Sequence, residues 1–100
     1  MITIQKTDVF LSWLRSLRDV KAAARIQIRV DRLALGNPGD VNSVGEGVSE
    51  LRIDYGPGYR VYYVQRGKLL LVLLCGGDKR NQNADIKMAL KMAKEFKHGT

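Results

Sequence analysis

Four basic side chains of this 100-residue sequence could meet around one anion. They stand on, or directly after, segments expected to form strands, and they are Arg52, Arg60, Lys79 and Arg80. Several guanidinium groups and an ammonium group around one phosphate would fix its oxygens and stabilise the extra charge of a pentacoordinate transition state. This is an electrostatic route to phosphodiester cleavage, and it requires that the fold bring these residues to one concave surface.

Two acidic residues alternate with Arg52 in the same segment. Glu50, Arg52 and Asp54 occupy every second position, and alternate residues of a strand share one face. Arg60 follows on the next expected strand and has Tyr62 on its own side. The spacing also allows a simpler role for Arg52, which is a structural ion pair with Glu50 or Asp54.

Other common catalytic constellations are absent from the sequence. No cysteine and histidine cluster has metal-ligand spacing, and no glycine-rich loop ends in Lys-Ser or Lys-Thr. The single histidine, His98, excludes a nuclease that works with two histidines. We therefore expect no metal and no cofactor. Cys75, the single cysteine, is expected to be a small core residue in a reducing compartment.

The composition is that of one basic globular domain that spans residues 1–100. Seventeen Lys and Arg against ten Asp and Glu give a formal net charge of +7, with a pI near 9.9. A surplus of this size attracts polyanions such as nucleic acid. No apolar run reaches the roughly 18 residues of a membrane span, and the first residues lack the pattern of a signal peptide. We expect a cytoplasmic protein that does not enter a membrane.

Two further groups of basic residues lie on expected helices. The second helix is expected to begin after Asp19 and to end at Gly36, with a broad apolar face made of Val20, Ala23, Ala24, Ile26, Ile28, Val30, Leu33 and Leu35. Basic residues three or four positions apart form one ridge on the opposite side: Arg18, Lys21, Arg25, Arg29 and Arg32. The last helix has Lys87, Lys91 and Lys94 on its outer face. Each ridge is either a docking surface for a polyanion or a solvated helix face.

The hydrophobic periodicity predicts a strand, two helices, three strands in a meander and a final helix. Their expected ranges are 2–6, 8–17, 19–35, 49–55, 59–66 and 69–75, followed by a helix capped by Asn81 or Asn83. Residues 40–47 have no period and are expected to form a loop. The unbroken apolar run 69–75 is typical of a central strand buried on both faces, which Gly76-Gly77-Asp78 is expected to end. A mixed α+β architecture follows.

Residues 48–89 resemble the core of the RelE/ParE superfamily of bacterial toxins, and most of all its HigB-type, phage-derived branch of addiction-module killer proteins. The distinctive segments are ELRI (50–53), GPGYRVYY (56–63) and LLCGGDKRNQNADI (73–86). The resemblance implies the RelE-like fold, in which a small, mostly antiparallel sheet has two N-terminal helices packed on it and a C-terminal helix. It extends over nearly the whole chain, because the first strand and the two helices also fall where that fold places them.

The resemblance also implies a function. RelE-like and HigB-like toxins of type II toxin–antitoxin systems are neutralised by a cognate antitoxin, here expected to be a helix-turn-helix protein. They cleave mRNA in the ribosomal A site without a metal, by attack of the ribose 2′-hydroxyl on the adjacent phosphate. By motif, Arg60 matches the phosphate-gripping arginine of the superfamily, Arg52 a basic position in the preceding strand, and Lys79 or Arg80 the basic residue after the last strand.

Within this mechanism, Glu50 or Asp54 would accept the proton of the 2′-hydroxyl. Lys79 or Arg80 would neutralise the leaving 5′-oxygen, and the two basic ridges would contact ribosomal RNA. The sequence departs from RelE at two places. It has Glu50 near the position of a second RelE lysine, and it has no tyrosine beyond Tyr63, whereas RelE has a catalytic tyrosine in its C-terminal segment.

Two other functions stay open at this stage. ParE-like members of the same superfamily poison DNA gyrase, a binding function that needs no phosphate-cleaving cluster. A phage-derived nucleic-acid-binding module without toxicity is the third interpretation. The presence of Arg52, Arg60 and Lys79 favours an endoribonuclease that acts on mRNA at the ribosome.

Overall fold

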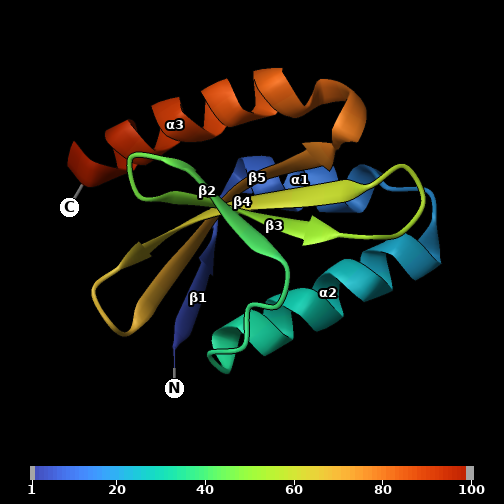
Figure 1. Ribbon diagram of the computed structural model, residues 1–100, viewed down its shortest axis with the longest axis horizontal. Coiled ribbons are helices and arrows are strands. Elements are labelled where there is room, and N and C mark those ends of the chain that lie inside the picture. Colours follow the sequence, from blue (N-terminus) through green and yellow to red (C-terminus); the bar gives the residue numbers. More distant parts are fainter. Residues whose placement is uncertain (1, 99–100) are drawn as a thin grey trace.

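The computed structural model describes residues 2–98, which form a five-stranded sheet and three α-helices (Figure 1). Along the chain the elements are β1 (Thr3–Lys6), α1 (Asp8–Ser16), α2 (Val20–Ala34), β2 (Val41–Gly45), β3 (Val48–Ile53), β4 (Tyr59–Arg66), β5 (Leu70–Asp78), a short 3-10 turn (Lys79–Asn81) and α3 (Gln82–His98). The strand order is β1-β5-β4-β3-β2, and β1 pairs in parallel with β5 while the other pairs are antiparallel. The expected α+β fold with a mostly antiparallel sheet is confirmed.

Helices cover both faces of the sheet. Helices α1 and α2 contribute Phe10 and Ile26 to a core on one face, where Leu51, Val61 and Leu73 project from the strands. On the other face, α3 packs Ala89 and Ala93 against a second core made of Val48, Tyr62, Val64, Val72, Leu74 and Cys75. Figure 1 shows α2 and α3 on opposite sides of the strands. Strand β5 is therefore buried on both faces, as its apolar run predicted, and the two N-terminal helices pack on the sheet as expected.

Capping side chains determine where the first two helices begin. The Thr7 hydroxyl accepts a hydrogen bond from the amide of Phe10 and donates one of 2.6 Å to the carbonyl of Leu74, so it joins the start of α1 to β5. The Asp19 carboxylate accepts hydrogen bonds from the amides of Lys21 and Ala22 at the start of α2. None of the helices in residues 2–98 combines the length and apolar character needed to cross a membrane.

The apolar face of α2 is narrower than expected. Val20, Ile28 and Leu35 are exposed, and the buried residues are Ala22, Ile26, Val30 and Leu33. Steps of four, four and three residues keep these four side chains in a single stripe, because the helix turns every 3.6 residues. This stripe supplies the buried apolar side chains of α2, whereas Val20 and Ile28 lie outside it and face solvent.

Residues 40–47 were expected to form a loop, and this prediction is wrong for most of the segment. Val41–Gly45 form strand β2, which pairs with β3 and has a bulge between Ser43 and Gly45. The strand is polar because it lies at the edge of the sheet, where one side makes no strand pairing within residues 2–98 and most side chains are exposed. Val41 and Val44 are half-buried and are the two residues that contact the cores.

Gly76 and Gly77 do not end β5, contrary to expectation. The strand continues to Asp78 and stays paired with β4, Gly76 opposite Val61 and Gly77 opposite Arg60. A Cβ at Gly76 would overlap the ring of Trp13, and a Cβ at Gly77 would overlap the carboxylate of Asp85. The glycines therefore allow α1 and α3 to approach the strand closely.

Candidate anion-binding site

A cleft of about 250 Å³ lies beyond the ends of β3 and β5, next to the turn between β3 and β4. Its lining consists of Asp40, Arg52, Asp54, Gly58, Arg60 and Lys79. Antiparallel pairing places Arg52 directly opposite Arg60 on one face of the sheet, as the alternation of residues predicted. The structure thus brings together three of the four basic residues singled out from the sequence.

Arg60 lines the cleft and makes few hydrogen bonds of its own. Its side chain is only 13% exposed, its Nη1 donates one long hydrogen bond of 3.5 Å to the carbonyl of Tyr59, and its Nε has no hydrogen-bond partner among the described residues. Beside it, the amide of Lys79 donates a 2.9 Å hydrogen bond to the carbonyl of Gly58. Nε is buried on the side of Glu50, so an anion that enters the cleft from solvent would bind the terminal nitrogens of this guanidinium.

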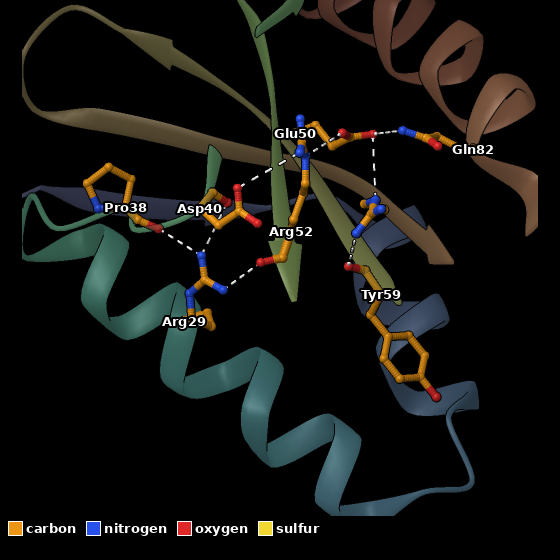
Figure 2. Close-up of polar contacts among 8 residues, drawn as sticks. Arg29, Pro38, Asp40, Glu50, Arg52, Tyr59 and Gln82 are labelled. Atoms are coloured by element: carbon orange, nitrogen blue, oxygen red, sulfur yellow. Dashed lines mark hydrogen bonds and ion pairs between the residues drawn. The ribbon is translucent and has the colours of Figure 1, made fainter. Parts of the chain in front are cut away.

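Arg52 forms the structural ion pair that the spacing allowed. Its Nε lies 3.3 Å from Oε1 of Glu50, and its Nη1 lies 4.0 Å from Oδ1 of Asp40 (Figure 2). The side chain is nevertheless 37% exposed, so its outer nitrogens face the cleft. The ion pair orients the guanidinium without removing it from the site.

Glu50 lies beneath the two arginines and does not line the cleft. Its carboxylate is 1% exposed and accepts hydrogen bonds from Tyr62 Oη at 2.9 Å and Gln82 Nε2 at 2.8 Å, in addition to the one from Arg52. Nε of Arg60 is 4.0 Å from the same carboxylate. Burial, together with the hydrogen bond to Glu50, raises the pKa of Tyr62, so its hydroxyl stays a donor. Glu50 therefore holds both guanidinium groups and connects β3 to the start of α3.

Glu50 and Asp54 were the two predicted proton acceptors, and of these Asp54 lines the cleft. It is exposed, it follows the last residue of β3, and it lines the wall that also contains Arg60 and Lys79. Asp40 lines the same cleft from the segment that precedes β2.

Neither Asp40 nor Gly58 was singled out from the sequence, because their place in the cleft depends on how the loops fold back on β3 and β4. Gln82 was missed for the same reason, as no local pattern shows that the start of α3 reaches Glu50.

Arg80 does not line the cleft, unlike the other three basic residues. Its Nη2 and Nε contact the carboxylate of Asp78 at 3.0 and 3.3 Å, and its side chain is 79% exposed. The hydrogen bond from Arg80 holds the pKa of Asp78 below its usual range. Arg80 lines a neighbouring hollow, together with Lys79, Asn81, Gln82, Asn83 and Ala84. The sequence left open whether Lys79 or Arg80 is the basic residue that acts after the last strand. Of these two, Lys79 lines the cleft.

The basic ridge of α2 is shorter than its sequence spacing suggested. Arg18, Lys21, Arg25 and Arg32 are exposed, whereas Arg29 is half-buried. Nη2 of Arg29 donates to the carbonyls of Pro38 at 2.9 Å and Asp40 at 3.3 Å, and Nη1 donates to the carbonyl of Arg52 (Figure 2). Arg29 thus joins α2 to the segment before β2 and to the end of β3. On α3, Lys87 and Lys91 are exposed, and Lys94 pairs with Glu46 at 3.7 Å.

Within residues 2–98, no group of three or more His, Cys, Asp or Glu side chains is arranged to hold a metal ion. Cys75 is buried in the core below α3 as a free thiol, and burial raises its pKa to about 12. The thiol therefore stays protonated and does not act as a nucleophile.

The fold and the cleft together define a small α+β protein with a cationic site at one end of its sheet. No family model matches the sequence. The chain is 50% identical over 95 residues to an uncharacterized protein of Haemophilus influenzae, and the match extends over 95% of this chain and 96% of that protein. The chain belongs to the same family as this Haemophilus protein.

Proposed function

We propose that the protein is a ribosome-dependent endoribonuclease that cleaves mRNA, and that it acts as the toxin of a type II toxin–antitoxin pair. The observation that carries the proposal is the convergence of Arg52, Arg60 and Lys79 with an exposed carboxylate, Asp54, in one cleft. A phosphate needs cationic donors, and a hydroxyl nucleophile needs a nearby proton acceptor. The cleft offers both.

In the proposed reaction, Asp54 accepts the proton of a ribose 2′-hydroxyl, and the 2′-oxygen attacks the adjacent phosphorus. The bond from phosphorus to the 5′-oxygen breaks, which leaves a 2′,3′-cyclic phosphate and a 5′-hydroxyl that takes its proton from water. Arg52 and Arg60 stabilise the charge on the pentacoordinate phosphate, and the Lys79 ammonium stabilises the leaving oxygen. Glu50 holds the two guanidinium groups in place.

The ribosome would position the mRNA, since the cleft is open and holds few groups that could orient a flexible strand by themselves. Exposed basic residues would dock on ribosomal RNA: Arg18 just before α2, Lys21 on α2, and Lys87 and Lys91 on α3. The proposed partners are thus the ribosome, mRNA and a cognate antitoxin with a helix-turn-helix domain, all in the cytoplasm.

The experiment compares the wild type with the double variant Arg52→Ala, Arg60→Ala on translating ribosomes, with primer extension as the readout of mRNA cleavage. We expect cleavage by the wild type and none by the double variant. Arg80→Ala is the control, because Arg80 is held by Asp78 outside the cleft. Cleavage that survives in the double variant would contradict the proposal. Inhibition of gyrase supercoiling by wild type and double variant alike, without mRNA cleavage, would establish the gyrase alternative instead.

A further inference from the structure

We propose that a second groove, between α2 and the end of β3, binds the part of the RNA strand that continues from the cleft. The groove has a volume of about 320 Å³ and is lined by Arg25, Ile28, Arg29, Arg32, Ile53, Asp54 and Tyr55. Asp54 lines both the groove and the cleft, so the two hollows meet at this residue. This inference rests on the proposed function, and it adds a path for the substrate beyond the reacting phosphate.

Two arginines of the groove are available for phosphates. Arg25 and Arg32 are exposed, and neither forms an ion pair within the described part of the chain, although ten acidic residues are present in the sequence. Arg29 adds a third positive charge to the lining, with its donors directed at backbone carbonyls. A groove with this charge attracts the backbone of a single strand.

The Arg25 guanidinium is held in place before any ligand binds. It lies 4.6 Å from the centre of the Tyr55 ring, and the Tyr55 hydroxyl donates a 3.2 Å hydrogen bond to the Asp19 carboxylate, which also caps α2. A cation over an aromatic face keeps its outward N–H groups free for an anion. The ordering of Arg25 therefore lowers the entropic cost of binding a phosphate.

The position of Asp54 indicates which kind of polyanion fits. A carboxylate between two cationic sites repels a phosphate but accepts a hydrogen bond from a hydroxyl. In RNA a 2′-hydroxyl lies between successive phosphates, whereas DNA has none. The order of cationic cleft, carboxylate and cationic groove thus matches a ribonucleotide strand and disfavours DNA.

The test is binding of a short fluorescent oligoribonucleotide to the purified full chain without ribosomes, followed by anisotropy over a series of salt concentrations. Arg25→Gln, Arg32→Gln is compared with Lys87→Gln, Lys91→Gln, which removes the same charge from α3 on the opposite face of the sheet. Each phosphate contact of a single strand contributes about 0.7 to the slope of log affinity against log salt, so the groove variant should lower the slope by about 1.4. Because the surface of α3 is proposed to dock on ribosomal RNA, which is absent from this assay, the α3 variant should lower the slope less.

Arg32→Gln alone leaves the contact between Arg25 and Tyr55 intact and should give about half of the change in slope, which separates loss of a phosphate contact from local unfolding. Equal effects of the groove and α3 variants would overturn the proposal, because they would indicate binding by overall charge alone. An unchanged slope in the groove variant would overturn it as well.

Asp54→Ala tests the choice of strand. The wild type should bind the oligoribonucleotide more tightly than its 2′-deoxy counterpart, and Asp54→Ala should remove most of this preference by weakening RNA binding while DNA binding stays equal or increases. A preference that persists in Asp54→Ala would overturn the role given to this carboxylate. Because the assay measures binding and not cleavage, a protein that uses the groove but leaves mRNA intact would overturn the proposed function alone.

Discussion

The hydroxyl of Tyr62 and the carboxylate of Glu50 lie 2.9 Å apart beneath the cleft, and the hydroxyl donates the hydrogen bond. Gln82 donates to the same carboxylate oxygen from the start of α3. Arg52 and Arg60 contact this carboxylate from the other side, at 3.3 and 4.0 Å. The arrangement of the cationic cleft therefore depends on a donor in the core of the sheet.

Tyr62→Phe tests this dependence, because it removes one donor from a buried carboxylate and leaves the ring in place. We expect the free energy of unfolding to fall by about 2 kcal/mol, the range typical of a hydrogen bond to a charged group. Tyr59→Phe is the matched control, since no hydrogen bond of its hydroxyl is found among the described residues. Urea denaturation of both variants gives the comparison. Equal losses would show that the Tyr62 hydroxyl has no special role.

Lys79→Ala and Arg80→Ala should differ sharply in activity, although they remove the same charge from adjacent positions. Lys79 lines the cleft, whereas Arg80 does not line it and pairs with Asp78. We expect Lys79→Ala to slow mRNA cleavage about a hundredfold, as the loss of one group that stabilises a transition state does. Arg80→Ala should leave the rate unchanged. Single-turnover cleavage on ribosomes measures both rates, and a larger loss in Arg80→Ala would reverse the assignment.

Gly76→Ala should destabilise the protein, because a Cβ at this position would overlap the ring of Trp13. Overpacking of this kind costs about 1–3 kcal/mol. The cause can be isolated by a double-mutant cycle with Trp13→Leu, in which the smaller side chain should restore part of the loss. Thermal and urea unfolding of the four proteins give the coupling energy. Additive losses would mean that the glycine is required for a reason other than the tryptophan.

Asp85→Asn should stabilise the protein at neutral pH. Burial raises the pKa of Asp85, and the charge of Asp78 raises it further. Oδ2 of Asp85 has no hydrogen-bond partner among the described residues. A carboxyl group with a raised folded-state pKa favours folding below its unfolded-state pKa and loses this contribution as the pH rises through the folded-state value. The gain from Asp85→Asn should thus be at most about 1 kcal/mol, should shrink as the pH falls through the raised folded-state pKa, and should be absent below the unfolded-state pKa.

Asp78→Asn is a control for this pH dependence, because the pKa of Asp78 is shifted in the opposite direction. The hydrogen bond from Arg80 lowers the pKa of Asp78, so its contribution to stability is present above the unfolded-state pKa and is lost as the pH falls through the folded-state value. Asp78→Asn should therefore destabilise the protein at neutral pH and have little effect in acid. Unfolding free energies measured across the acidic range check both variants, and changes of the same sign would contradict this account.

Local patterns predicted most of the fold and the centre of the cleft. Alternation along β3 and β4 placed Arg52, Arg60 and Tyr62 on one face, because the side-chain period of a strand is two regardless of its surroundings. Periodicity failed for β2, whose polar residues form a strand only because β3 offers an edge to pair with. It also failed for Gly76, where a residue that usually interrupts strands is needed for contact with Trp13.

The remaining errors at the site concern contacts between residues far apart in the sequence. Arg29 belongs to the basic ridge by spacing, but it binds the carbonyls of Pro38, Asp40 and Arg52, which only the tertiary fold brings within reach. The choice between Lys79 and Arg80 depends on the capping role of Asp78. Glu50 was considered as a proton acceptor, and its burial under Gln82 could not be seen from its own segment.

The parallel pairing of β1 with β5, in which Thr3 lies opposite Leu70, also affects the order of folding. Strand β1 has no pairing partner, and the Thr7 hydroxyl has no acceptor for its proton, until β5 has been synthesised, since Thr7 bonds to Leu74 across 67 positions of the chain. Contacts of such high sequence separation slow folding. The hairpin of β3 and β4, which holds Arg52 and Arg60, can form well before that closure. During synthesis, the hairpin with these two arginines would therefore form before β5, which completes the core, and before Lys79, which completes the cleft.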